Sequence, residues 1–256
     1  MCGIVGYVGT PGQSKPALGV VIDALRRMEY RGYDSAGIAL LDGSGGMAVE
    51  KKAGKLDNLV ATVESAGLEN YPATTGIGHT RWATHGRPTD INAHPHVDQL
   101  GKIAVVHNGI IENFAPLRAE LEAQGVEFTS ETDTETVTHL LHAEYYGEGP
   151  NAGNFTASVM AVINRLEGAF TLVIAHADHP DMLMACRRST PLVIGVGEHQ
   201  MFLGSDVAAF IEHTREAVEL GQDNVVTITA DGYTITDFEG NPVEGRPFTI
   251  DWDLEA

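Results

Sequence analysis

MCGIVGYVG, residues 1–9, contains a short apolar run bounded by glycines, which predicts a β-strand. A cysteine stands at the start of this strand, directly after the initiator methionine. Removal of Met1 would give Cys2 a free α-amine with a pKa of about 7.7–8.0, suited to accept the thiol proton. A terminal amine beside a side-chain nucleophile is an established route to covalent catalysis. We therefore predict that Cys2 is the nucleophile of an acyl-transfer reaction, the alternative being a small buried core residue.

Charge and composition argue against several classes of function. The chain has 256 residues, of which 16 are basic and 35 acidic, for a formal charge of −19. So negative a surface argues against a nucleic-acid partner or an anionic membrane. The sequence has no apolar run of about 18 residues and no signal-peptide pattern at its start. Cys2 and Cys186 are too few for a disulfide framework, so we expect a reducing, cytoplasmic location.

The order of apolar patterns predicts an α+β fold. Helical spacing of apolar residues occurs in five segments: residues 17–32, 55–66, 112–125, 134–147 and 157–168. Strand patterns occur at residues 4–9, 36–41, 46–52, 75–80, 102–109, 169–176, 182–188, 191–197 and 224–230. Strands joined by short turns imply antiparallel sheets with helices on their outer faces. We expect one domain over residues 2–240, followed by a Gly/Pro-rich acidic edge or linker at 241–256.

Residues 105–113, VVHNGIIEN, offer an oxyanion hole for such a reaction. Asn108 has a side-chain amide to donate, and Gly109 has a backbone N–H. Donors of this kind stabilise the tetrahedral intermediate of acyl transfer, and the loss of one raises the barrier by roughly 2.7–4 kcal/mol. The alternative is a plain Asn-Gly turn between two strands.

A polar stretch, GHTRWATHGRPTDINAHPH at residues 78–96, suggests a substrate-binding loop. The guanidinium of Arg81 is suited to bind a carboxylate, although a structural salt bridge is the simpler role. The polar residues around Gly86 form a candidate mobile lid. A metal site is a more specific alternative to the substrate-binding loop, because four histidines lie close together in this stretch: His79, His85, His94 and His96.

Two further polar stretches flank predicted helices. SETDTETVTH, residues 130–139, has the residues of a helix cap, but Asp133 is also suited to bind a substrate ammonium. MEYRGYDSAG, residues 28–37, places Arg31 where it satisfies backbone groups or supports the active site. A substrate with a carboxylate, an ammonium and an acyl group open to thiol attack fits these predictions together. Glutamine has all three.

Six motifs in order resemble the class II, or N-terminal nucleophile, glutamine amidotransferases: CGIVGYVG, EYRGYDSAGIA, GIGHTRWATHG, NAHPH, VVHNGIIEN and SETDTE. Within that class they are similar to the glutaminase domain of isomerising glutamine–fructose-6-phosphate aminotransferases. The resemblance spans residues 2 to about 240. It implies a four-layer αββα sandwich of two stacked antiparallel sheets covered by helices. It also implies hydrolysis of L-glutamine to L-glutamate and ammonia through a Cys2 thioester, without a metal or other cofactor.

The resemblance also assigns roles to individual residues. The catalytic group would be Cys2, Asn108 and Gly109. The substrate-binding group would be Arg81, Trp82, Thr84, His85 and Asp133. Arg31 would support the terminal cysteine. Full-length members continue into a sugar-phosphate isomerase half, which uses the ammonia to aminate fructose 6-phosphate, and they are oligomeric.

Two alternatives stay open at this point. The histidines between His79 and His96 fit a metal-dependent hydrolase, which a chelator would inactivate. Retention of Met1 would block the amine of Cys2 and leave a catalytically silent glutamine-binding module.

Overall fold

The strand that follows Cys2, β1 (Gly3–Gly9), lies within a large antiparallel sheet and is buried along its whole length. The structure is a computed structural model that describes residues 2–31, 34–83 and 86–251. Val5 and Tyr7 pack on one face of the sheet, against helices, whereas Ile4 and Val8 pack on the other face, against a second sheet. A strand covered on both faces is apolar at successive positions rather than at every second one, which explains the uninterrupted apolar run in the sequence.

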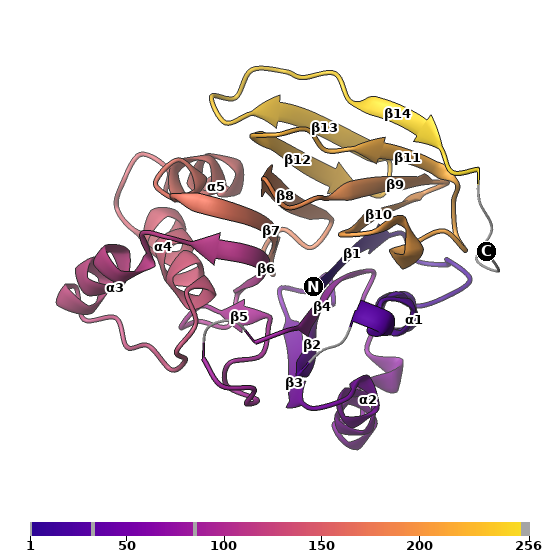
Figure 1. Ribbon diagram of the computed structural model, residues 1–256, viewed down its shortest axis with the longest axis horizontal. Helices are drawn as coiled ribbons and strands as arrows, with labels where there is room; N and C mark the ends of the chain where they lie inside the picture. The colour runs from indigo at the N-terminus through magenta and orange to yellow at the C-terminus, as the bar shows by residue number, and fades with distance from the viewer. Residues whose placement is uncertain (1, 32–33, 84–85, 252–256) are drawn as a thin grey trace.

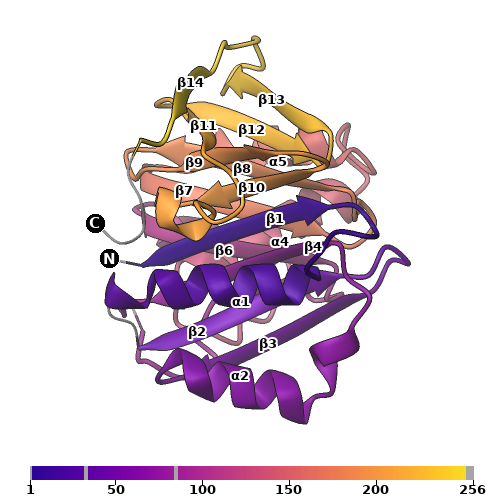
Figure 2. The same cartoon turned by 90° about the vertical axis from the view of Figure 1, so that its right-hand side faces the viewer.

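The first sheet has eight strands in the order β14-β11-β9-β10-β1-β4-β2-β3, and all their pairings are antiparallel. Its other strands are β2 (Ser35–Leu41), β3 (Met47–Ala53), β4 (Thr75–Arg81), β9 (Val193–Gly197), β10 (Gln200–Gly204), β11 (Glu216–Glu219) and β14 (Arg246–Thr249). Two helices, α1 (Ala17–Arg27) and α2 (Leu56–Ser65), cover its outer face (Figure 2).

The second sheet has six strands in the order β13-β12-β8-β7-β6-β5, again all antiparallel. They are β5 (His96–Val97), β6 (Ile103–Ile111), β7 (Gly168–His176), β8 (Met182–Arg188), β12 (Asn224–Thr229) and β13 (Gly232–Asp237). Three helices lie on the side of this sheet away from the first sheet (Figure 1): α3 (Phe114–Ala123), α4 (Thr134–Tyr146) and α5 (Phe155–Ile163).

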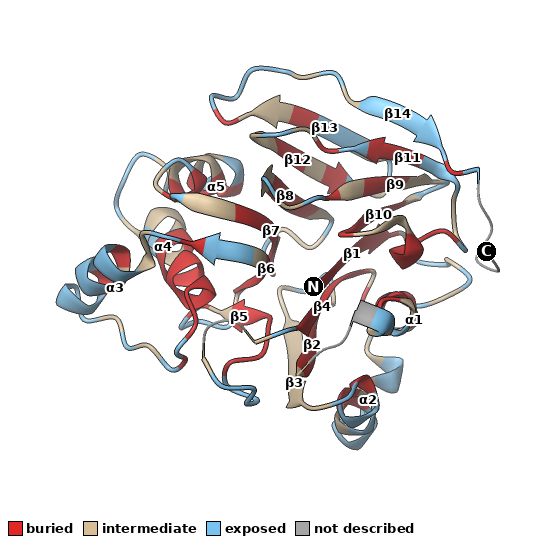
Figure 3. Cartoon of the chain, viewed as in Figure 1, coloured by how far each residue is buried: buried red, intermediate tan, exposed pale blue. Residues whose placement is uncertain are grey.

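Three apolar clusters hold these layers together. One joins α1 and α2 to the first sheet, one fills the space between the two sheets, and one joins α3, α4 and α5 to the second sheet. Buried residues accordingly follow the strands and the inner helix faces, and the outer faces of α2 and α3 and the strand β14 are exposed (Figure 3). The predicted α+β sandwich of four layers is therefore confirmed.

All five predicted helices and nine predicted strands are present, with ends shifted by a few residues. The sequence of residues 206–214, DVAAFIEHT, also predicts a short helix, of which the structure forms a single 3₁₀ turn, Val207–Ala209. Five strands have no counterpart in the prediction: β5, β10, β11, β13 and β14. Because β14 pairs with β11, the first sheet continues past residue 240, where the sequence suggested only an edge or linker. No helix among the described residues is long and apolar enough to span a membrane.

Candidate active site

Residues from both sheets line a cavity of about 300 Å³, which brings together six of the nine site residues predicted from the sequence. Cys2 precedes β1, and the backbone of Gly3 pairs with Thr80 near the end of β4. β6 brings Asn108 from the second sheet. The cavity is lined by Cys2, Arg81, Trp82, Asn108, Gly109 and Asp133, among others.

The thiol of Cys2 is partly buried and held by the neighbouring strand end. The backbone N–H of Trp82 donates a hydrogen bond to Sγ at 3.0 Å. Burial raises the pKa of the thiol, and the Trp82 N–H and the charge of Arg81 oppose this only in part. The thiol is therefore protonated at neutral pH, so a nucleophilic role requires a base.

The start of β1 is fixed by two buried hydroxyl groups. The N–H of Gly3 donates to Thr80 Oγ1 at 3.1 Å, and the N–H of Ile4 donates to Ser205 Oγ at 3.0 Å. A side chain at Gly3 would bring its Cβ within 2.7 Å of Thr80 Oγ1. The backbone next to Cys2 is thus held by hydrogen bonds to β4 and to the residue that follows β10.

Asn108 and Gly109 lie where β6 leaves the core. The side-chain amide of Asn108 donates through Nδ2 to the carbonyl of Cys2 at 3.0 Å. Gly109 has φ = +113°, and a Cβ there would stand 2.0 Å from the carbonyl oxygen of Ala169 on β7. Only glycine fits at this position. The Asn-Gly pair is not a turn between strands, because both residues lie inside β6 and pair with β7.

Arg81 ends β4 and is only 4% exposed. Its guanidinium donates to the carbonyl oxygens of Gly86 and Arg87, both at 3.3 Å. Burial lowers its pKa, and the nearby acidic groups, Cys2 and Asp34 among them, oppose this. An arginine remains charged in proteins, so the cavity has a cation in its wall.

Asp133 directly precedes α4 at the N-cap position, yet its side chain accepts no capping hydrogen bond from a backbone N–H of that helix, and only the hydroxyl of Thr134 donates to Oδ1, at 3.3 Å. Its Oδ2 atom accepts from the N–H of Ile111 at 2.8 Å, and Oδ1 lies 3.7 Å from His107 Nδ1. The carboxylate is therefore turned toward β6 and lines the cavity. The capping role that the sequence allowed does not belong to Asp133.

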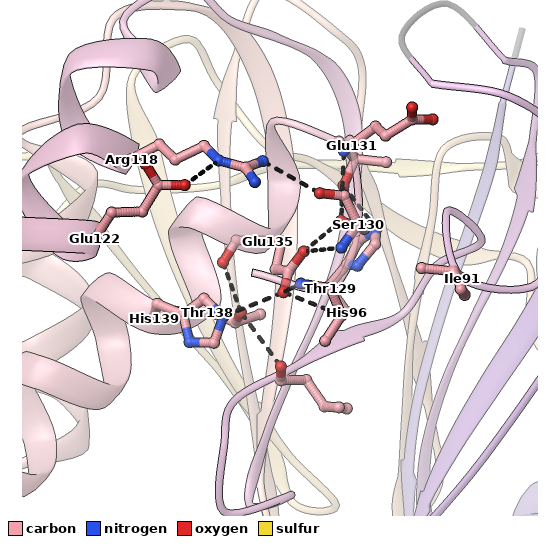
Figure 4. A network of polar contacts seen from close by, with 12 residues as sticks. Ile91, His96, Arg118, Glu122, Thr129, Ser130, Glu131, Glu135, Thr138 and His139 are labelled. Carbon is pink, nitrogen blue, oxygen red and sulfur yellow. Dashed lines mark hydrogen bonds and ion pairs between the residues drawn. The ribbon is translucent and has the colours of Figure 1, made fainter. Parts of the chain in front are cut away.

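Glu135 instead accepts the hydrogen bonds of backbone N–H groups in the segment before α4 (Figure 4). Its carboxylate accepts from the N–H groups of Thr129 and Ser130 at 2.8 and 2.7 Å. Burial would raise the pKa of this carboxyl, but the hydrogen bonds from His139, Ser130 and Thr129 outweigh it and hold the pKa well below its usual range. Asp133 and Glu135 thus have separate tasks, since Asp133 faces the cavity and Glu135 is structural.

The remaining predicted site residues divide into two groups. Trp82 is 52% exposed and lies at the cavity wall, where it can cover a bound molecule. Thr84 and His85, predicted for the lid, lie outside the described residues. Arg31 ends the 3₁₀ turn Glu29–Arg31, and its side chain lies outside the described part of the structure as well.

The histidine cluster is arranged as a stack. His79 and His94 are parallel with ring centroids 4.2 Å apart. His79 Nε2 faces two carbonyl-type oxygens and must carry a proton, whereas His94 Nδ1 accepts from the N–H of His107 at 3.2 Å. These nitrogens are committed to other partners. Within residues 2–31, 34–83 and 86–251, no three metal-ligating side chains are grouped to hold an ion.

Sequence reasoning missed several residues of the cavity wall, namely His107, Ile110, Thr190, Pro191 and Ser205. The hydroxyl of Thr190 donates to the carbonyl of Asn108 at 3.3 Å, so the turn after β8 supports the Asn-Gly segment. A Ser-Thr-Pro sequence directly after a strand is a weak signal for such a turn. Nothing local in the sequence indicates which strand it would support.

Residues 79–212 match the family model of the glutamine amidotransferase domain, and the chain belongs to this family of glutamine-using enzyme domains. Among curated proteins, it is 65% identical over its full length to a glutamine–fructose-6-phosphate aminotransferase (isomerizing) of Mycolicibacterium smegmatis, of which it covers 41%. It is 58% identical over its full length to the enzyme of the same name from Streptomyces coelicolor, covering 40%. The chain thus spans about two fifths of the length of these relatives.

Solved structures show the same fold. Glutamine phosphoribosylpyrophosphate amidotransferase from B. subtilis superposes with a TM-score of 0.76 at 24% identity, over 94% of this chain and 50% of that one. A glutamine aminotransferase class-II domain protein from Silicibacter pomeroyi gives a TM-score of 0.59 at 17% identity, over 93% of this chain and 99% of that one. The predicted resemblance to the glutamine amidotransferases is confirmed.

Proposed function

We propose that the chain hydrolyses L-glutamine to L-glutamate and ammonia through a thioester on Cys2. One observation carries this proposal: a single cavity of about 300 Å³ is lined by a thiol, an amide donor, a buried guanidinium and a buried carboxylate. Membership of the glutamine amidotransferase domain family supports glutamine as the amide substrate.

Substrate binding rests on the two buried charges. Arg81 would bind the α-carboxylate of glutamine, since a guanidinium matches a carboxylate with paired donors. Asp133 would bind the α-ammonium. The two charges then fix the amino-acid end and direct the side-chain amide toward Cys2. Trp82, with Thr84 and His85 in the same loop, would cover the bound substrate, and Arg31 would support the terminal cysteine.

The reaction requires the free amine of Cys2. After removal of Met1, that amine accepts the thiol proton, and Sγ attacks the carboxamide carbon. Negative charge then develops on the amide oxygen, where Asn108 Nδ2 and the N–H of Gly109 are the donors we assign. Return of the proton to the leaving nitrogen releases ammonia and leaves the thioester. Water, deprotonated by the same amine, attacks the thioester and releases glutamate.

The names of the relatives suggest what the released ammonia is used for. We propose that this chain is the glutaminase part of a glutamine–fructose-6-phosphate aminotransferase and that an isomerase part of the same protein aminates fructose 6-phosphate. Residues 241–256 would lead toward that part, and the complete enzyme would be an oligomer of the cytoplasm. No metal or other cofactor is needed for the glutaminase steps.

Ammonia release from glutamine tests the proposal directly. Cys2→Ala should abolish turnover while leaving glutamine binding measurable by calorimetry. Cys186→Ala is the matched control, because that thiol is fully buried and burial raises its pKa to about 12. An alkylating glutamine analogue should label Cys2 alone. Undiminished turnover by Cys2→Ala would reject the proposal.

Two further measurements separate the alternatives. A chelator should leave the activity unchanged, whereas loss of activity that zinc restores would favour a metal-dependent hydrolase built on the histidine cluster. Mass spectrometry of the intact chain gives the state of the N-terminus. A chain that retains Met1 should bind glutamine without turnover, as a silent module would.

A further inference from the structure

A side-chain amide has two ends of nearly equal shape, and only one of them can donate. For Asn108 to stabilise an oxyanion, Nδ2 must face the thiol and Oδ1 must face away. The hydrogen-bond network determines which end lies where. In the structure Nδ2 is directed at the carbonyl of Cys2, and Oδ1 lies 3.0 Å from His79 Nε2.

The second partner of His79 settles which atom of that pair donates. His79 Nε2 also lies 3.0 Å from the backbone carbonyl oxygen of His107. A carbonyl only accepts, so Nε2 must carry the hydrogen, which it shares between His107 O and Asn108 Oδ1. Were the amide of Asn108 reversed, its NH₂ group would face this N–H, and two donors would meet in a buried site.

The imidazole is rigidly placed for this task. His79 is fully buried, and its backbone pairs with Ile4 on β1 and with Gly37 on β2. Its ring stacks on His94 and reaches across to β6 of the other sheet. Gly37 leaves room for the stack, since a Cβ there would lie 2.0 Å from the carbonyl oxygen of His94. Burial lowers the pKa of His79 to about 3, so the ring stays neutral at working pH.

We propose that His79 is a positioning residue that fixes the amide orientation of Asn108 and thereby aims the donor of the oxyanion hole at the reacting carbonyl. The proposal rests on the proposed glutaminase function. It assigns His79 no contact with glutamine and no proton transfer. The expected signature is therefore a loss in kcat that depends on Asn108, without a matching rise in KM.

Two substitutions at His79 separate the donor from the bulk of the ring. His79→Leu is of similar size and removes the N–H, whereas His79→Gln retains an NH₂ near the position of Nε2. In glutamine hydrolysis, His79→Leu should lower kcat by about tenfold to a hundredfold, less than the roughly 10²–10³-fold loss expected for Asn108→Ala. The KM for glutamine should change by less than about threefold. His79→Gln should restore kcat to within about tenfold of wild type.

A double-mutant cycle tests whether the effect passes through Asn108. In the Asn108→Ala background, His79→Leu should lower kcat no further. An equal loss in both backgrounds, or a loss confined to KM, would overturn the positioning role. So would full activity of His79→Leu.

A readout independent of turnover distinguishes failure of this inference from failure of the glutaminase proposal. In a chain labelled with [¹⁵N]asparagine, the Nδ2 hydrogens of Asn108 should show nuclear Overhauser contacts to Cys2. These contacts should weaken in His79→Leu and persist in His79→Gln. Unchanged contacts in a folded His79→Leu variant would reject the inference, whatever the activity. A wild-type chain that shows these Overhauser contacts but does not hydrolyse glutamine would reject only the glutaminase proposal.

Discussion

Lowering the pH should destabilise this chain well before its carboxyl groups titrate, because several histidines are buried as neutral rings with pKa values that burial lowers. His79, His94 and His96 are at most 5% exposed. Burial lowers the pKa of His79 from 6.5 to about 3, and it lowers the pKa values of His94 and His96 well below 6.5. The unfolded chain therefore binds protons that the folded chain excludes. The neutral histidines contribute their full stability above a pH of about 6.5, the pKa of histidine in the unfolded chain. This contribution is lost as the pH falls from there toward the pKa values of the folded state.

The size of the effect follows from proton counting. Between pH 6 and pH 5, an unfolded imidazole binds on average about 0.9 proton more than a folded one that stays neutral. A histidine that stays neutral, as His79 does with a pKa of about 3, then costs about 1.2 kcal/mol over this interval. The other buried histidines, whose pKa values burial also lowers, add to the loss in the same direction. A typical free energy of unfolding is about 5–15 kcal/mol, so such losses are a substantial part of the total.

Urea unfolding followed by circular dichroism at pH 8, 7, 6, 5.5 and 5 measures this dependence. His79→Gln removes one titrating ring, so the loss of stability between pH 6 and pH 5 should be smaller by about 1.2 kcal/mol in this variant. His199→Asn serves as the surface control, since its side chain is 67% exposed and asparagine tolerates the positive φ of 53° at that position. A free energy of unfolding that stays constant between pH 6 and pH 5 would refute the reasoning, as would an unchanged slope in His79→Gln.

Three further predictions concern the site. Gly109→Ala should abolish glutamine hydrolysis and lower the melting temperature, because its Cβ would stand 2.0 Å from Ala169 O at φ = +113°; a variant with wild-type activity would contradict this. Asp133→Asn should raise KM for glutamine by about tenfold or more with a smaller change in kcat, since the amide oxygen can still accept from Ile111 N–H but no longer pairs with an ammonium. The kcat/KM for glutamine should rise about tenfold per pH unit up to a pKa near 8, that of the Cys2 amine, and a flat profile from pH 6 to pH 8 would exclude the amine as base.

Local chemistry in the sequence was enough to predict most elements and to single out several residues that line the cavity. The apolar period of 3.6 places five helices, because burial of one helix face imposes that period, and short apolar runs bounded by turn residues place nine strands. Cys2 was singled out as a candidate nucleophile by its position directly after Met1, and the structure places it in the cavity wall. Asn108 and Gly109 stood out because an amide and an unhindered N–H are what an oxyanion requires.

Strand partners were decided by the tertiary structure alone. β1 pairs with β4 and with β10, whose residues lie about 200 positions away in the case of Val5 and Gly204. A period of two shows which residues share a face, but it does not specify which strand lies alongside. The closeness of Cys2 to the end of β4, and hence to Arg81, depends on that choice. β14 is likewise a strand because its backbone pairs with the free edge of β11.

The sequence also did not predict in which direction the polar side chains point. Asp133 and Glu135 both fit a helix cap by residue type, and the structure turns one to β6 and the other to the preceding segment. The reason is that a buried carboxylate is oriented by whichever backbone N–H groups the neighbouring elements leave unpaired. His79 shows the same dependence. Its residue type allowed a metal ligand, and only the carbonyl oxygens brought to it by β6 make Nε2 a donor to Asn108.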